Sequence, residues 1–183
     1  MELTNLAIDA VKLIRPRRFS DARGYLVETW NRHTFLEAGI DVDFVQDNAS
    51  FSGRAPTIRG LHYQTPPMAH AKLVRVVRGA IFDVAVDLRK DSPSFGQHVG
   101  VELTPESGQL LFIPVGFAHG FCTLEPDTEV AYKLSNLYSP KHDTGIAWDD
   151  PALGIEWPLA GREPILSDKD RTLPCLSQVP SPF

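Results

Sequence analysis

The segment Gly108-Gln-Leu-Leu-Phe-Ile-Pro-Val-Gly-Phe-Ala-His119 decides how this chain is expected to fold. Its apolar run 110–113 has the composition of a buried strand, and Pro114 and Gly116 supply a turn directly after it. His119 then enters the next apolar run. The segment therefore predicts two consecutive strands, the second of which carries a histidine.

Runs of β-branched and aromatic residues recur on both sides of this segment, and each is followed by turn residues. They lie at 25–30, 44–51, 73–77, 80–86, 99–103, 110–113 and 130–134. Fifteen prolines and thirteen glycines leave little room for long helices. One short surface helix is expected at 31–39, where Asn31 is a suitable N-cap and Gly39 a suitable stop. The spacing predicts an all-β sandwich or barrel with short peripheral helices.

Length and composition favour one domain over residues 1–183. With 183 residues, of which 43% are hydrophobic, the chain can bury a full core, and two cysteines are too few for a disulfide framework. Beyond Pro140 the apolar residues become isolated, so residues 140–183 are expected to wrap a core built by the rest. Residues 174–183 are expected to be mobile.

Charge argues against several classes of partner. A net charge of −5 provides no basic face for nucleic acid or an anionic membrane. The longest uncharged run, 107–124, contains a glutamine, a proline, a histidine and three glycines, so no membrane span is expected. The first residues do not read as a signal peptide, and a cytoplasmic protein is the expectation.

A polar cluster, Arg59-Gly-Leu-His62-Tyr-Gln64, is followed by Lys72. On a regular strand His62 and Gln64 share one face and Arg59 the other, unless a bulge intervenes. On local sequence alone, His62 is better explained as a hydrogen-bonded histidine in the core or at its rim.

The pattern G-x5-P-x-G-x2-H that ends at His119 resembles the second motif of the cupins, whose double-stranded β-helix, or jelly roll, binds metals and small molecules. A metal-binding cupin needs two further histidines and a glutamate, but His62, Gln64 and Lys72 stand at those positions. An ammonium group repels a cation and an amide is a poor ligand for a transition metal. No metal site is expected, although a metal-dependent cupin remains an alternative.

Two further groups carry polar side chains. Tyr132 and Tyr138 are six residues apart and would face one cavity on a continuous strand, although strand tyrosines more often simply pack. Residues 167–171 contain Asp168, Lys169 and Asp170, a run that by itself is typical of a solvated helix start.

Together these groups resemble the dTDP-4-dehydrorhamnose 3,5-epimerases, a family of metal-free cupins. The resemblance covers nearly the whole chain, through segments 21–24 with Glu28, 44–48, 59–64, 72–87, 92–96, 113–121, 132–133, 138–140, 148–151 and 166–170. It implies inversion of C3 and C5 in dTDP-4-dehydro-6-deoxy-D-glucose, on the route to dTDP-L-rhamnose and cell-surface polysaccharide. It implies no cofactor, and a homodimer that exchanges an N-terminal strand.

The same resemblance implies roles for individual residues. His62 would be the base, with Asp170 as its orienting carboxylate, although a small shift in spacing would favour Asp168. Lys72 and Arg59 would face the C4 oxygen, and Tyr132 would return a proton from the opposite face. Substrate binding would fall to Arg23, Glu28, Gln46, Asn48, Arg59, Lys72, His119, Tyr138, Asp143 and Lys169.

Three positions depart from the family's usual pattern. Asp143 stands where many members have glutamate, Leu26 where the residue is often aromatic, and Ala49 where it is frequently polar. These departures concern nucleotide preference rather than chemistry. An epimerase of a single centre, C3 or C5, and a sugar-nucleotide-binding cupin without catalysis are the alternative functions.

Overall fold

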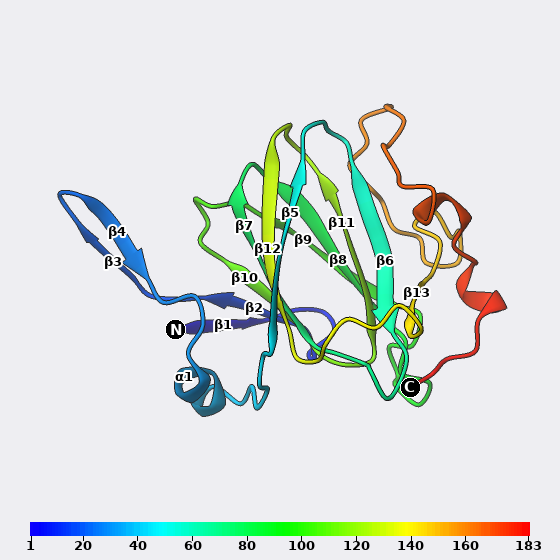
Figure 1. The fold of residues 1–183 in the computed structure, drawn as a ribbon, viewed down its shortest axis with the longest axis horizontal. Helices are drawn as coiled ribbons and strands as arrows, with labels where there is room; N and C mark the ends of the chain where they lie inside the picture. The colour runs from blue at the N-terminus through cyan, green and yellow to red at the C-terminus, as the bar shows by residue number, and fades with distance from the viewer.

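The computed structural model describes residues 1–183 as two antiparallel sheets that face each other (Figure 1). The six-stranded sheet has the order β1 (Glu2–Asn5), β2 (Lys12–Arg15), β10 (Leu110–Ile113), β7 (Lys72–Arg78), β12 (Thr128–Leu134) and β5 (Gln46–Ser52). The five-stranded sheet has the order β13 (Asp143–Gly145), β6 (Ile58–Gln64), β11 (Phe117–Thr123), β8 (Ile81–Asp87) and β9 (His98–Leu103). The predicted jelly-roll class is confirmed.

The main core lies between the two sheets because both have apolar inner faces. Val74 and Val130 point inward from the six-stranded sheet, and Ile81 and Phe121 do so from the five-stranded sheet. Each is at most 4% exposed, and a fully buried side chain of this kind contributes about 1.5–3 kcal/mol through removal of apolar surface from water.

The C-terminal segment covers the outer face of the five-stranded sheet (Figure 1). Ile146 and Leu153 join the buried cluster that includes Leu61 and Val84, and the short 3-10 turns η1 (Asp170–Thr172) and η2 (Leu176–Gln178) follow. The mobility predicted for residues 174–183 is not what the structure shows. The Phe183 ring lies 6.0 Å from that of Tyr63, and the Lys90 amide donates to the Phe183 carbonyl oxygen at 2.9 Å. The apolar residues of this segment pack one at a time against the rest of the protein, so they form no periodic pattern from which their burial could be predicted.

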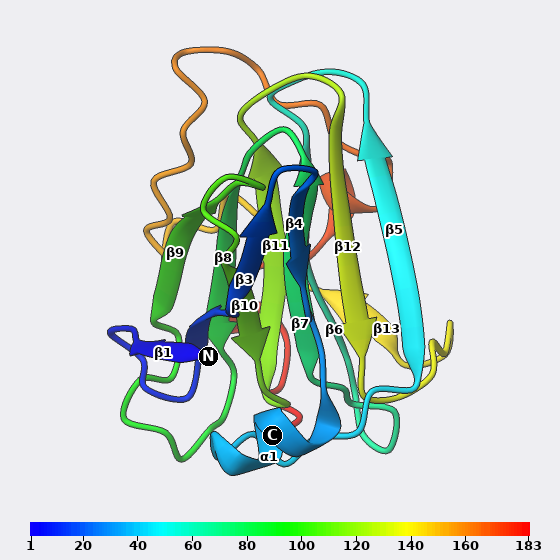
Figure 2. The same cartoon turned by 90° about the vertical axis from the view of Figure 1, so that its left-hand side faces the viewer.

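The predicted surface helix is confirmed as α1 (Arg32–Glu37), which covers part of the outer face of the six-stranded sheet (Figure 2). The Asn31 side chain accepts hydrogen bonds from the amides of His33 and Thr34 at 3.0 and 3.2 Å, so it is the N-cap. Phe35 anchors the helix and is 2% exposed. No helix in the structure is both long and apolar enough to cross a membrane.

One element extends away from the body: the hairpin of β3 (Arg18–Asp21) and β4 (Gly24–Val27), which pair only with each other (Figures 1 and 2). Its apolar side chains are unusually open, with Phe19 52%, Tyr25 56% and Leu26 72% exposed. The strand predicted at 25–30 corresponds to β4, which ends earlier, at Val27. Strands β1, β2 and β3 were not predicted from the sequence.

Candidate active site

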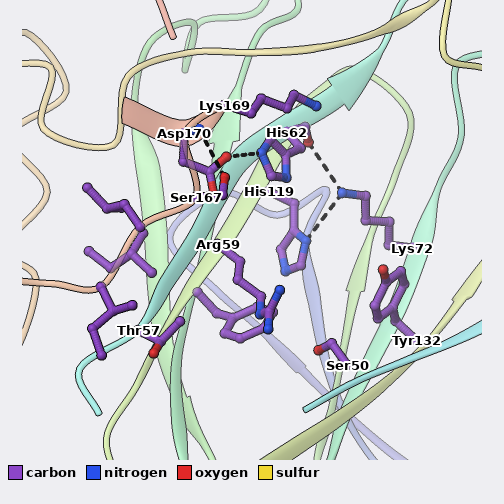
Figure 3. A pocket seen from close by; sticks show the side chains of 14 residues that line it. Ser50, Thr57, Arg59, His62, Lys72, His119, Tyr132, Ser167, Lys169 and Asp170 are labelled. Carbon is purple, nitrogen blue, oxygen red and sulfur yellow. Dashed lines mark hydrogen bonds and ion pairs between the residues drawn. The ribbon is translucent and has the colours of Figure 1, made fainter. Parts of the chain in front are cut away.

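A cavity of about 390 Å³ opens between the two sheets at the end where the C-terminal segment crosses β6 (Figure 3). Strands from both sheets supply its polar side chains. The lining residues are Ser50, Thr57, Ile58, Arg59, His62, Lys72, His119, Phe121, Tyr132, Ile165, Leu166, Ser167, Lys169 and Asp170. The cavity thus brings together all four residues predicted to be catalytic, His62, Lys72, Tyr132 and Asp170.

An irregularity in β6 places Arg59 and His62 on the same side. The pairing with β11 shifts between His119, which faces His62, and Phe121, which faces Arg59. Regular alternation would have separated Arg59 from His62, so this is the bulge that the sequence left open. Gly60 lies within it at φ +130°, where an added Cβ would approach the Gly120 Cα to 2.5 Å. A side chain at position 60 would force β6 and β11 apart.

His62 is held by a buried carboxylate. Its Nε2 lies 2.5 Å from Oδ1 of Asp170, which is 4% exposed, whereas Asp168 is exposed and makes no contact with the imidazole (Figure 3). Burial by itself raises the pKa of Asp170, but hydrogen bonds from His62 and Ser167 outweigh it and hold this pKa below the usual value. Because an ionised carboxylate accepts the Nε2 proton, the Nδ1 lone pair of His62 is free to accept another.

Lys72 is almost fully enclosed beside the two histidines. Its Nζ lies 3.3 Å from the backbone oxygen of His62 and 3.3 Å from Nδ1 of His119 (Figure 3). Burial lowers the pKa of Lys72 to about 8, although the negative charges of Asp83 and Asp143 oppose that change. An ammonium group has three donors, so the third N–H remains available to a molecule in the cavity.

Tyr132 enters the cavity from β12, in the sheet opposite to that of His62. Tyr138, expected on the same face, does not line the cavity, because β12 ends at Leu134 and Tyr138 follows in a loop. Tyr138 is 53% exposed and donates a hydrogen bond to Asp143 at 3.2 Å. The two tyrosines therefore lie in different places, Tyr132 in the cavity and Tyr138 outside it.

The residues predicted to bind the nucleotide form a connected polar rim. The Gln46 side chain donates to Asn48 at 2.9 Å and accepts from the Tyr138 amide at 2.9 Å. Asp143 accepts from Tyr138 and from Lys169, the latter at 2.6 Å. Gln46 and Asn48 occupy inward-facing positions of β5, as does Ser50, which lines the cavity. The rim therefore continues into the cavity.

Two of the predicted binding residues lie elsewhere. Arg23 is at the turn of the projecting hairpin, where its side chain is 89% exposed and pairs with Asp21. Glu28 is exposed and accepts a hydrogen bond from the Asn31 side chain at 3.1 Å. Neither lines the cavity of its own chain, because the hairpin leads away from it (Figure 1).

Sequence reasoning missed Asp83, which lies behind the cavity on β8. Its carboxylate is fully buried and lies 2.6 Å from Nε2 of His119. The available signal was a charged residue at an inward position of an apolar strand, between Ile81 and Ala85. No group of three or more histidine, cysteine, aspartate or glutamate side chains converges as metal ligands would.

The comparison with known families decides the assignment. The family model described as dTDP-4-dehydrorhamnose 3,5-epimerase matches residues 5–178. The chain belongs to this family. It is therefore an isomerase, of the carbohydrate epimerase class.

Individual relatives match this chain over most of their length. A dTDP-4-dehydrorhamnose 3,5-epimerase from Sinorhizobium fredii is 50% identical over 183 residues, which are 100% of this chain and 93% of that one. A dTDP-6-deoxy-D-glucose-3,5-epimerase from Legionella pneumophila, solved in complex with dTDP-4-keto-L-rhamnose, superposes with a TM-score of 0.93 at 42% identity, covering 98% of this chain and 94% of that chain. A 3'-monoepimerase from Streptomyces bikiniensis, in complex with dTDP-quinovose, gives a TM-score of 0.87 at 35% identity, covering 94% and 87%.

Proposed function

We propose that this chain is a dTDP-4-dehydrorhamnose 3,5-epimerase that inverts both C3 and C5 of dTDP-4-dehydro-6-deoxy-D-glucose. The observation that carries the proposal is that an imidazole and a phenol, groups suited to be a base and a proton donor, lie on opposite walls of one cavity. His62 stands on the five-stranded sheet and Tyr132 on the six-stranded sheet. A sugar ring between them has one face toward each, and inversion requires a proton to leave one face and arrive at the other.

The substrate's ketone explains why so few groups suffice. C3 and C5 both flank the C4 carbonyl, so loss of either proton gives an enolate. His62 accepts that proton on Nδ1, while Asp170 fixes the ring and stabilises the imidazolium that forms. A positioned general base contributes about 10²–10⁴ in rate.

Lys72 stabilises the negative charge that develops on the C4 oxygen, with Arg59 beside it on the cavity wall. Both side chains are fixed before substrate arrives: Lys72 contacts two protein acceptors, and Arg59 donates to Ser52 and to the Phe51 carbonyl oxygen. Preorganised donors of this kind act without reorganisation during the reaction, and removal of one typically costs about 10²–10³ in rate.

Tyr132 then delivers a proton to the carbon from the face opposite His62. The phenol carries an O–H group that it can donate. The sugar has then exchanged one proton for another, and solvent takes the proton from the His62 imidazolium and returns one to the Tyr132 phenolate before the next inversion. No cofactor enters any of these steps.

Binding of the nucleotide falls to the rim, where Gln46 and Asn48 offer amide groups and Tyr138 an open aromatic ring. Lys169 supplies positive charge for the diphosphate, as a point charge rather than a fork. This local charge reconciles an acidic protein with an anionic substrate. The cytoplasmic location expected from the sequence stays a prediction.

We further propose that the protein is a homodimer in which the hairpin β3–β4 reaches the partner subunit. The hairpin's apolar side chains Phe19, Tyr25 and Leu26 are largely exposed, and surface patches of this kind are typical of interfaces. A hairpin that lies over the partner's cavity brings Arg23 to the site that its own chain cannot reach. The exchange makes the interface isologous, as closed dimers require.

Inversion at a single carbon is the second candidate, and the likeness to a 3'-monoepimerase favours considering it. The catalytic residues do not separate the two, because the same base and donor act at either carbon. A binding protein without catalysis is less well supported, since ligand binding alone does not call for a buried His62–Asp170 pair.

The deciding experiment is proton NMR of dTDP-4-dehydro-6-deoxyglucose incubated with the enzyme in D₂O. Deuterium entry with inversion at both C3 and C5 is the expected result. Inversion at one carbon alone would assign a single-centre epimerase. Tight dTDP binding with no exchange would contradict the proposed substrate.

A further inference from the structure

Asp83 is a buried charge that the proposed mechanism does not use. It is 0% exposed and lies on the inner face of β8, the same face as the core residues Ile81 and Ala85 two positions to either side. It does not line the cavity, so it cannot touch a bound sugar. Placing an ionised carboxylate in such surroundings is costly unless it is paired.

The only side-chain partner of this carboxylate is His119. Oδ1 of Asp83 lies 2.6 Å from Nε2 of His119, and Oδ2 is buried without a hydrogen bond. His119 is itself 7% exposed in its side chain. The only hydrogen bond by which Asp83 can position a group of the site is therefore the one to this imidazole.

The contacts on the two ring nitrogens define the tautomer of His119. An ionised carboxylate only accepts hydrogen bonds, so Nε2 carries a proton and donates it in a hydrogen bond to Asp83. Lys72 only donates, so Nδ1, at 3.3 Å from its Nζ, carries the lone pair. An imidazole with the opposite tautomer would present an N–H to the ammonium group and repel it.

We propose that Asp83 is a positioning residue, which holds His119 in the Nε2–H tautomer so that the Nδ1 lone pair fixes the Lys72 ammonium group where the C4 oxygen of the substrate binds. The proposal rests on the proposed function for the role of Lys72. It adds a second carboxylate–imidazole pair to the site, and it gives the buried charge a reason to be there.

The charges around Lys72 support the arrangement independently. Burial lowers the pKa of both Lys72 and His119, which favours the uncharged forms. Asp83 and Asp143 are the negative groups that oppose this effect on Lys72, while Lys169 adds to it. Asp83 thus helps to keep the ammonium group charged. It also raises the pKa of His119, but burial, with the positive charge of Lys72, outweighs this and keeps that pKa below its usual value.

The first test needs no substitution. The ¹⁵N chemical shifts of His119 in the ligand-free wild-type enzyme distinguish a protonated ring nitrogen from one with a lone pair. We expect a protonated Nε2 and an unprotonated Nδ1. A protonated Nδ1 would overturn the proposal. Because this measurement uses no substrate, it is independent of whether the proposed reaction is right.

The second test is Asp83→Asn, which keeps the volume but removes the obligatory acceptor. We expect mixed His119 tautomers and a fall in kcat of about 10–100-fold, with KM changed less than kcat because Asp83 does not touch the substrate. The matched control is Asp87→Asn, which removes another fully buried carboxylate from β8. Asp87 pairs with Arg89, away from the cavity, so the control leaves the His119 signals unchanged.

A double-mutant cycle separates positioning from a general loss of structure. If Asp83 acts through His119, then Asp83→Asn changes kcat by less than about twofold when His119 is already alanine. Equal losses in both backgrounds, or a normal kcat in Asp83→Asn, would overturn the proposal. Inactivity of the wild type toward this substrate would instead contradict the proposed function and leave the tautomer measurement standing.

Discussion

His62 and His119 are cross-strand partners on β6 and β11, and each has an aspartate at Nε2. Their surroundings give them different chemistry. The side chain of His62 is 29% exposed, so its Nδ1 is accessible to a ligand. The side chain of His119 is enclosed, and its Nδ1 accepts a hydrogen bond from Lys72. Under the proposed function, two similar pairs thus act in different ways, one as a base and the other as a support.

The choice between the two C-terminal aspartates is testable. Asp170→Asn removes the charge that orients His62, and we expect kcat to fall by about 10²–10⁴, as when the orienting carboxylate of a catalytic histidine is neutralised. Asp168→Asn is the matched control, because Asp168 is exposed and does not contact His62. Steady-state kinetics of both variants measure the difference, and equal losses would mean that Asp170 has no special role.

Tyr132→Phe separates proton loss from inversion. Without the phenol, His62 still removes the proton, exchanges it with solvent and returns deuterium to the same face. We therefore expect deuterium entry in D₂O to survive while inversion slows by about 10²–10⁴. Tyr138→Phe, at the exposed rim, should keep the wild-type ratio of exchange to inversion. If exchange and inversion fall equally in Tyr132→Phe, the donor role is wrong.

The pH dependence of kcat follows from Lys72. Its pKa is lowered to about 8, chiefly by burial, so the side chain is charged below that pH and neutral above it. Since only the ammonium form stabilises the enolate, we expect kcat to decline as pH rises through about 8. Lys72→Arg is the control, because a guanidinium stays charged in this range. The Lys72→Arg variant should be slower overall, and its kcat should not decline between neutral pH and about pH 9. If its kcat declines as the wild type's does, the decline belongs to another group.

At the scale of elements, α1 depends on its N-cap. Asn31→Ala leaves the amides of His33 and Thr34 without their acceptor, and such substitutions typically lower the free energy of unfolding by about 1 kcal/mol. Because Phe35 docks the helix in a buried cluster, the loss should appear in global unfolding by denaturant. His33→Ala, at an exposed position, should change stability by less than about 0.5 kcal/mol. An equal effect of both would argue against capping.

Strands with buried apolar positions could be predicted because their patterns are strong, and exposed ones could not. The runs at 73–77, 80–86 and 99–103 reappear as β7, β8 and β9 within two residues. β1 and β3 are four residues each and almost wholly exposed, so no buried face imposes a pattern on them. Their conformation comes from the strands they pair with.

The site could be predicted in part for a related reason. The family resemblance implied roles for His62, Lys72, Tyr132 and His119, and all four lie on strands and line the cavity. Asp83 was missed because its role depends on a contact across two strands. The bulge that turns Arg59 toward the cavity was left open, since the close approach of Gly60 to Gly120 is visible only in three dimensions.

For the whole molecule, the proposed exchange of the hairpin makes Arg23 a residue of the partner's site. We expect Arg23→Ala to weaken kcat/KM by at least about tenfold, the typical cost of losing a charge-assisted hydrogen bond of about 1.5 kcal/mol. That result alone does not say which cavity Arg23 serves. Its side chain is 89% exposed in the single chain.

Mixed dimers decide between the two cavities. His62→Ala is expected to be inactive and Arg23→Ala impaired, each as a homodimer. When the two are refolded together, a mixed dimer with exchanged hairpins has one cavity with both His62 and the partner's Arg23, and another with neither. Random pairing makes about half of the dimers mixed, so activity should rise to about a quarter of wild type. If Arg23 served its own chain's cavity, no mixed dimer would contain an intact site, and activity would stay at the average of the two variants.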